Sequence, residues 1–154
     1  MQYWLLKTEP SSFSVEDLQR APRRTACWDG VRNYQARNML RDSIKRGDRA
    51  LLYHSSCAEP GIVAILEVVK EGYPDPTAFE PKHEHFDPAS RRDAPRWFMV
   101  DVRLERRLAR LIALEELRAN AGGKLRGMSL LRAGNRLSVM PVDALHWKFI
   151  LSLE

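Results

Sequence analysis

The chain has 154 residues, of which 44% are hydrophobic and 29% charged, and its 25 lysines and arginines outnumber its 20 acidic residues to give a net charge of +5. This composition excludes a disordered polyelectrolyte, and the length is enough for one domain with a real core. The positive balance favours an anionic partner such as nucleic acid, although plain soluble proteins often share it.

Nothing at the start of the chain indicates export. The N-terminus has only a short apolar run with no basic segment before it, and no stretch approaches the roughly 18 apolar residues of a membrane span. Two cysteines, Cys27 and Cys57, are too few for a disulfide framework or a thiolate zinc cage. We therefore expect a reduced, cytoplasmic protein without membrane contact, associated with the nucleoid if the cell is bacterial.

The first elements are short. Tyr3 to Leu6 is aromatic and aliphatic enough for a strand, which Pro10 ends because a proline cannot donate to a strand ladder. Ser14 followed three residues later by Asp17 is typical of a helix N-terminus. We expect this helix to reach about Arg20 and a loop to follow it.

Residues 28–34 have the composition of a binding site. Trp28 offers a flat aromatic face, Gly30 lets a ligand approach the backbone, and Asn33 carries a donor and an acceptor that can read a base edge. Arg32 adds a planar charged fork suited to phosphate. The same run also fits a plain helix start with a polar cap and Trp28 in the core, so both interpretations stay open here.

A helix is predicted from Asn33 to Arg46. Apolar residues recur on one side at helical spacing, while Arg37, Arg41 and Lys45 recur every four residues along an adjacent side. This basic stripe suits a phosphate backbone, although a run of charge is more often a solvated face.

Two strands follow, from Arg49 to His54 and from Gly61 to Val69, and the second is nearly continuous in aliphatic residues and therefore buried. The loop between them holds a histidine, two serines and a cysteine, a set that invites a nucleophilic-catalysis interpretation. Neighbours on an extended chain point to opposite faces, however, and no nucleophile elbow or cysteine-protease signature surrounds Cys57. We therefore expect no catalytic residues.

A polar loop is predicted from Gly72 to Pro95. It contains His83 and His85, which could both face a metal if the segment were extended. With no cysteine nearby and prolines around the pair, a solvated loop is the preferred interpretation, and we expect no metal or other cofactor. Trp97 to Arg107 is then a strand, with Trp97 at its start and facing away from the main core.

The last third carries a short helix from Ala113 to Asn120, a turn and short strand within residues 134–141, and a final helix capped by Asp143. Trp147 on that helix is expected in the core. Strands separated by short helices, without repeats or linkers, predict a small mixed α/β barrel in a single domain.

Several long motifs occur in order along nearly the whole chain. They are Tyr3-Trp4-Leu5-Leu6-Lys7-Thr8-Glu9-Pro10, Trp28-Asp29-Gly30-Val31-Arg32-Asn33-Tyr34-Gln35-Ala36-Arg37, Tyr53-His54-Ser55, Pro60-Gly61-Ile62-Val63, Tyr73-Pro74-Asp75-Pro76-Thr77 and Arg136-Leu137-Ser138-Val139-Met140-Pro141-Val142. This set closely resembles the EVE domain family. The resemblance implies one EVE domain over residues 1–154, with a PUA-like fold of α/β (α+β) class, a distorted mixed β-barrel flanked by short helices.

The same resemblance implies a nucleic-acid-binding module that reads a modified base, with 5-modified cytosine in DNA as the ligand class. By position, the modified-base pocket would use Trp28 and Trp97 as stacking or wall residues and Asn33 and Ser55 as polar readers. Its remaining members would be Gly30, Val31 and Ser138. The residues that would line the pocket mouth or meet the nucleic-acid backbone are Lys7, Glu9, Arg32, Tyr34, Arg37, Arg41, His54 and Arg136.

DNA with a modified base is thus the expected partner, ahead of RNA. The alternatives are an enzyme acting on nucleotides or nucleic acid, with His54, Glu9 or Cys57 as the chemical group, and a protein-docking subunit with an exposed Trp97. A buried methyl group contributes only about 0.8 kcal/mol, so we expect strong salt dependence with a modest preference for a methylated base. Trp28→Ala and Asn33→Ala should each abolish selective binding without unfolding the protein.

Overall fold

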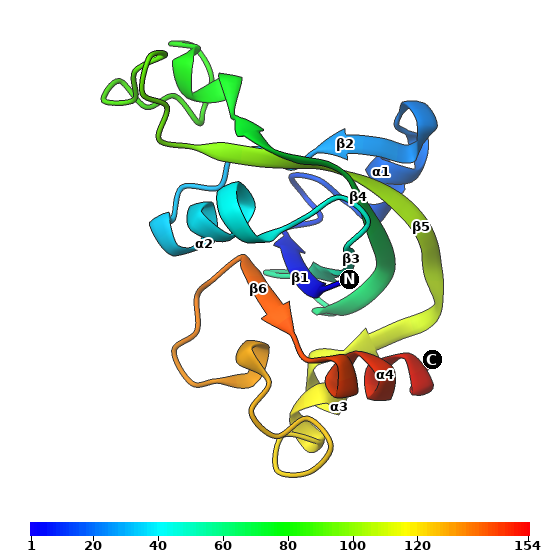
Figure 1. Cartoon of the computed structure of the whole chain (residues 1–154). Coiled ribbons are helices and arrows are strands. Elements are labelled where there is room, and N and C mark those ends of the chain that lie inside the picture. Colours follow the sequence, from blue (N-terminus) through cyan, green and yellow to red (C-terminus); the bar gives the residue numbers. More distant parts are fainter.

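The computed structural model describes residues 1–154 and is built around one curved sheet of six strands (Figure 1). The strands are β1 (Tyr3–Thr8), β2 (Thr25–Cys27), β3 (Arg49–His54), β4 (Gly61–Pro74), β5 (Phe98–Ala113) and β6 (Val139–Val142). Their order is β2-β5-β4-β3-β1-β6, with β1 parallel to β3 and every other neighbouring pair antiparallel. The sheet is mixed, as predicted, but the two edge strands, β2 and β6, do not pair with each other, so the expected barrel is open.

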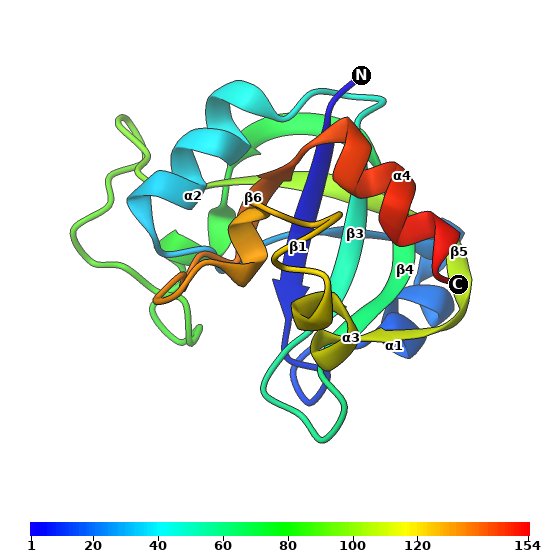
Figure 2. The ribbon, with the colours of Figure 1, turned by 90° about the horizontal axis from the view of Figure 1, so that it is seen from below.

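Short helices connect the strands. They are α1 (Val15–Arg20), α2 (Tyr34–Asn38), α3 (Leu114–Ala119) and α4 (Ala144–Ser152). Single 3₁₀ turns cover Pro22–Arg24, Pro76–Phe79 and Ser129–Leu131, and a π-helical turn, Met39–Ser43, follows α2. Seen from below, β1 lies between α2 and α4 (Figure 2). None of the helices is both long enough and apolar enough to cross a membrane.

Two hydrophobic clusters fill the two sides of the sheet. Because successive side chains of a strand point to opposite faces, Trp4 and Leu6 join one cluster and Leu5 joins the other. Residues of α1 and α2 belong to the first cluster, and residues of α3 and α4 belong to the second. Trp147 packs in the second cluster, as predicted, and stacks on Tyr3 with ring centroids 4.4 Å apart.

The predicted helix starts are confirmed. The Ser14 hydroxyl accepts a hydrogen bond from the Asp17 N–H, and the Asp17 carboxylate accepts one from the Ser14 N–H. Asn33 caps α2, since its Oδ1 accepts from the Ala36 N–H at 3.0 Å. Asp143 stands at the N-cap of α4 but makes no side-chain cap bond.

The helix predicted from Asn33 to Arg46 is shorter than expected. α2 gives way to the π-helical turn at Met39, and the backbone is extended at Ile44. The buried carboxylate of Asp48 helps to end it, because it accepts hydrogen bonds from the Lys45 N–H at 2.9 Å and the Trp4 indole at 3.0 Å. Lys45 therefore lies beyond the helix, and the basic stripe does not extend to it.

Both long strands exceed their predicted limits. β4 continues to Pro74, so the loop expected from Gly72 begins later, and β5 continues to Ala113. Their pairing shifts register at several points, and such bulges let paired strands bend together. The three residues of β2 are too few to give a periodic signal, which is why the sequence predicts a loop there.

Gly72 lets β4 pass close to the π-helical turn, and we expect Gly72→Ala to lower the free energy of unfolding by about 1–3 kcal/mol, the usual cost of overpacking. A Cβ here would overlap the Leu40 carbonyl oxygen and lie 3.0 Å from the Arg41 Cα. Urea unfolding measures the change. The control is Gly122→Ala, where a Cβ meets nothing within 4 Å and the change should be about 0.5 kcal/mol or less. Equal stability of the two variants would contradict the close approach.

Candidate functional site

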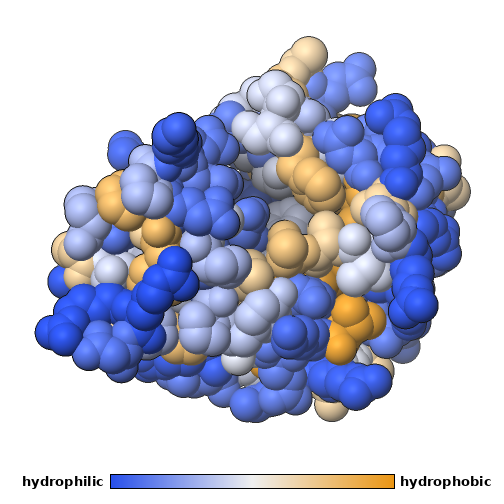
Figure 3. Space-filling model, turned by 90° about the horizontal axis from the view of Figure 1, so that it is seen from above, coloured by the Kyte–Doolittle hydropathy of each residue, from blue (hydrophilic) through white to orange (hydrophobic).

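A hollow of about 750 Å³, here called the Trp28 hollow, lies between the end of β1, the β2–α2 connection and residues 83–85. Its apolar wall includes Phe13, Trp28 and Val31. Its polar lining residues are Lys7, Thr8, Glu9, Ser12, Asp29, Arg32, His83, Glu84, His85 and Ser138. Figure 3 views the molecule from the side of β2 and residues 76–97, where the surface is largely hydrophilic and hollowed near its centre.

Trp28 belongs to the hollow and to the core at once. The residue is only 7% exposed, lies in the same hydrophobic cluster as Trp4, and packs edge-on against Phe13 with ring centroids 6.3 Å apart. Trp28 can therefore bound a ligand as a wall. The expectation that Trp28→Ala leaves the fold intact needs correction, because removing a core indole costs about 3–5 kcal/mol.

The buried carboxylate of Asp75 holds the β2–α2 connection in place. Its Oδ2 accepts hydrogen bonds from the Gly30 N–H at 2.8 Å and from Arg32 Nη1 at 3.0 Å. Its Oδ1 accepts from the N–H and the hydroxyl of Thr77 at 2.9 and 2.6 Å. Burial by itself would raise the pKa of Asp75, but these hydrogen bonds outweigh it and hold the pKa below its ordinary value.

Sequence patterns do not single out Asp75. Its only signal is its place in the motif Tyr73-Pro74-Asp75-Pro76-Thr77, which contributes to the family resemblance. An aspartate between two prolines fits a turn equally well, and only the fold shows that its carboxylate is fully buried.

Arg32 uses all five of its N–H groups inside the protein. Nε and Nη2 donate to the His85 carbonyl oxygen at 3.2 and 2.8 Å, and the other groups donate to a neighbouring carbonyl, to Asp75 and to the Thr77 hydroxyl. The guanidinium predicted to meet phosphate is thus a brace between the β2–α2 connection and the segment around His85.

The braced segment places His85 against Gly30. Gly30 has a φ of +76°, and a Cβ there would overlap the His85 imidazole, so the ring occupies the space that glycine leaves. His83 Nδ1 accepts a hydrogen bond from the His85 N–H at 3.0 Å, whereas His85 Nδ1 is buried without a partner. One ligand atom from each of Asp29, His83 and His85 lies within 4.8 Å of the others, a donor set with the chemistry to hold a transition-metal ion.

Lys7, near the end of β1, lines the Trp28 hollow. Its backbone N–H donates to the Ser138 carbonyl oxygen at 2.8 Å, which joins the end of β1 to the start of β6. Burial lowers the pKa of Lys7. Its Nζ lies 5.8 Å from the Tyr53 ring centroid, and Glu9 is exposed at the rim nearby.

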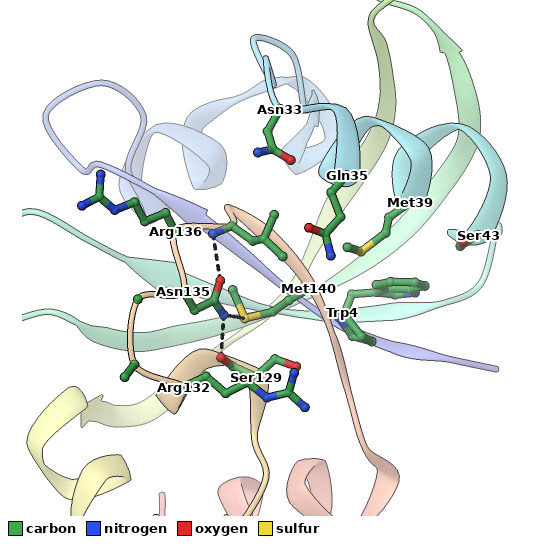
Figure 4. A pocket seen from close by; sticks show the side chains of 14 residues that line it. Trp4, Asn33, Gln35, Met39, Ser43, Ser129, Arg132, Asn135, Arg136 and Met140 are labelled. Carbon is green, nitrogen blue, oxygen red and sulfur yellow. Dashed lines mark hydrogen bonds between the residues drawn. The ribbon is translucent and has the colours of Figure 1, made fainter.

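A second hollow of about 830 Å³, here called the Asn33 groove, separates the start of α2 from residues 132–137 (Figure 4). Asn33 and Gln35 line it from α2, and Arg132 and Arg136 line it from the opposite segment. The structure thus places Asn33 and Arg136 on opposite sides of one groove, apart from the Trp28 hollow.

The segment that carries both arginines is held by Asn135. Its Nδ2 donates to the Ser129 carbonyl oxygen at 2.5 Å, and its Oδ1 accepts from the Leu137 N–H at 2.9 Å (Figure 4). Gly134 supplies the turn with a φ of +76°.

Several predicted site residues line neither hollow. Trp97 is 6% exposed, donates its indole N–H to Asp87 at 2.7 Å and stacks on Tyr34 with ring centroids 4.9 Å apart. The exposed Trp97 that a protein-docking subunit would need is therefore absent. Ser55 is tied to the end of β1 by its backbone N–H, which donates to the Thr8 carbonyl oxygen at 2.9 Å.

The other predicted contact residues are engaged within the protein. His54 is buried, its Nε2 accepts a hydrogen bond from the Val15 N–H at 3.2 Å, and burial lowers its pKa. Arg37 donates to the Arg96 carbonyl oxygen at 2.6 Å. Arg41 forms a two-pronged ion pair with Asp42, with both N···O distances 2.8 Å.

A curved mixed sheet that carries an aromatic and polar hollow beside a basic groove defines a small binding domain of the PUA-like class. A family model described as the EVE domain matches residues 2–153. The chain belongs to the EVE domain family, as its motifs predict.

One similar protein and two similar solved structures support this assignment. Mouse thymocyte nuclear protein 1 is 50% identical over 167 aligned positions, which cover 99% of this chain and 73% of the mouse protein. The crystal structure of the human THYN1 protein in complex with 5-methylcytosine-containing DNA matches with a TM-score of 0.94 at 45% identity, covering 99% of this chain and 97% of that one. A crystal structure from Pseudomonas syringae matches with a TM-score of 0.91 at 44% identity, covering 98% of each chain.

We expect Asp75→Ala to lower the free energy of unfolding by about 3–5 kcal/mol, because it leaves the Arg32 guanidinium and the Gly30 N–H without their buried partner. Denaturant unfolding at neutral pH measures the loss. Asp93→Ala is the matched control, because it removes an exposed ion pair with Arg91, worth less than about 1 kcal/mol. Similar losses in both variants would contradict the role given to Asp75.

The contribution of Asp75 should also depend on pH. Because the folded-state pKa is below the ordinary value, the stabilisation is present above the ordinary pKa and is lost as the pH falls through the folded pKa. The difference in stability between the wild type and Asp75→Asn should therefore shrink as the pH falls below about 4. A series of urea titrations tests this, and a difference that grows on acidification would contradict it.

Proposed function

We propose that this protein acts as one EVE domain over residues 1–154 that binds DNA containing 5-methylcytosine and holds the modified base in the Trp28 hollow. The likeness to the human THYN1 protein in complex with such DNA carries the proposal. Because that likeness covers 99% of this chain, it includes every element that lines the hollow.

The lining of the hollow suits an extruded base. Trp28 and Val31 form an apolar wall for the ring and its methyl group, and Lys7, Glu9 and Ser138 lie where exocyclic groups can form hydrogen bonds. Enzymes and readers that extrude a base hold it between apolar walls and read its polar edge in this way. The brace of Asp75 and Arg32 keeps the opposite wall, residues 83–85, at a fixed distance.

The energies require contacts beyond the base itself. Extruding a base from a duplex costs a few kcal/mol, while stacking on an aromatic side chain returns about 1–3 kcal/mol. Trp28 is largely buried, so little of its ring is open to a base and the free energy of stacking lies at the lower end of this range. Useful affinity therefore depends on phosphate contacts, which also make binding sensitive to salt.

The proposed role is binding without catalysis. His54 cannot act as a base through Nε2 while that atom accepts the Val15 N–H, and His54 lines neither hollow. If the cell is bacterial, a DNA-binding role is compatible with a protein that lies in the cytoplasm, at the nucleoid.

We expect Ser138→Leu to abolish the preference for 5-methylcytosine, because the larger side chain fills the Trp28 hollow. Fluorescence anisotropy with oligonucleotides that differ at one cytosine measures the preference, which should be about fourfold in the wild type, the value of one buried methyl group. Ser11→Leu, at an exposed serine outside the lining, is the control and should keep it.

Two results would overturn the proposal. One is equal binding of methylated and unmethylated DNA by the wild type, and the other is tighter binding of RNA than of DNA of the same sequence. A preference that survives Ser138→Leu would exclude the Trp28 hollow as the place of the base.

A further inference from the structure

The basic residues that the sequence marks as a phosphate track, Arg37, Arg41 and Lys45, are already engaged within the protein. Arg41 is ion-paired with Asp42 at 2.8 Å, and Lys45, beyond the end of the helix, lies 3.9 Å from Glu71. Arg37 is held by a carbonyl oxygen and lies over the Tyr34 ring at 5.0 Å. A cation already paired with a carboxylate gains less from a phosphate, because it must first give up its partner.

Unpaired cations gather elsewhere. Lys7, Arg118, Arg132 and Arg136 make no ion pair and no side-chain hydrogen bond within the chain. Arg132 and Arg136 line the Asn33 groove. Lys7, Arg118 and Arg132 line an adjoining hollow of about 380 Å³, and both hollows share residues 132–135. The four cations thus form one continuous surface, here called the basic saddle.

The distribution of acidic residues separates this surface from the Trp28 hollow. No aspartate or glutamate lines the Asn33 groove or the adjoining hollow. Glu9, Asp29 and Glu84, by contrast, all line the Trp28 hollow. Phosphate groups are therefore repelled from the place proposed for the base and attracted to the saddle next to it. Lys7 belongs to both surfaces and marks the boundary between them.

The Asn33 groove also supplies neutral donors. The amide groups of Asn33 and Gln35 face the groove across from the two arginines (Figure 4). Neither NH₂ group donates a hydrogen bond within the chain, whereas Asn33 Oδ1 is engaged in the cap of α2. Free amide donors facing arginines are typical of surfaces that bind phosphate and sugar oxygens.

We propose that the basic saddle, formed by Lys7, Arg118, Arg132 and Arg136, binds the phosphodiester backbone of the DNA strand next to the extruded nucleotide. This inference rests on the proposed function and adds to it the path of the strand, which runs from the Trp28 hollow past Lys7 into the Asn33 groove. It replaces the stripe on α2 as the main source of salt-dependent affinity.

The test measures the dissociation constant of a 5-methylcytosine-containing DNA duplex over a series of NaCl concentrations. Each of Arg118→Gln, Arg132→Gln and Arg136→Gln should reduce the slope of log affinity against log salt by about 0.9, the value of one phosphate contact in duplex DNA. The triple variant should lose about three times as much. Affinity for methylated and unmethylated DNA should fall by the same factor, because phosphate contacts carry no information about the base.

Arg126→Gln is the matched control. Arg126 is exposed and its side chain is unpaired, like those of the saddle, but it lines none of the hollows, so its loss should leave the slope unchanged. Arg41→Gln separates the two candidate tracks, because the slope should fall with it only if the backbone binds along α2 and the π-helical turn that follows. All of these side chains are at the surface, and circular dichroism confirms that each variant is folded.

The outcomes distinguish the saddle from the proposed function. A wild-type slope in the three saddle variants, or an equal loss in Arg126→Gln, would overturn the saddle whatever the base preference. A reduced slope in the saddle variants would support it, even if the wild type showed no preference for 5-methylcytosine. In that case the proposed reading of the base fails while the backbone surface stands.

Discussion

One buried carboxylate fixes the geometry on which the site depends. Asp75 lies just beyond β4, yet its oxygens hold Gly30 and Arg32 on the β2–α2 connection, and Arg32 in turn holds the carbonyl of His85. The β2–α2 connection is thereby joined to two later segments, at Asp75 directly and at His85 through Arg32. Each member depends on the others, since a buried carboxylate is tolerated only when its hydrogen bonds are complete. The hollow is consequently preformed, and little ordering is needed when a ligand enters.

The charges around this rigid centre are divided between two surfaces. Three carboxylates line the Trp28 hollow, whereas the charged residues that line the Asn33 groove and its neighbour are all cations. A neutral base and a charged backbone belong to the same nucleotide, so a protein that holds both needs two environments within a short distance. Lys7, at the end of β1, stands between them. Burial removes its ammonium group partly from water and lowers its pKa.

Local patterns predict much of this structure, and long-range contacts decide the rest. Ser14 and Asn33 cap helices as their sequence neighbours indicate, and the alternation in β1 places Trp4 and Leu5 on opposite faces. The helix after Asn33 ends early because Asp48, distant in sequence from Trp4, gathers hydrogen bonds there. The same limit applies to the site. Composition identifies residues 28–34 as a candidate, but it cannot show that Arg32 is fully bonded or that Asn33 faces a different hollow from Trp28.

The open sheet has two free edges, and both are poor templates for another chain. β2 contributes only the three residues Thr25–Cys27, and β6 contains Pro141, which has no N–H to offer an incoming strand. Short edges and edge prolines are the usual protections against strand-to-strand association. A sheet that does not close into a barrel thus keeps its strand ends available to a ligand, while its two edge strands resist pairing with other chains.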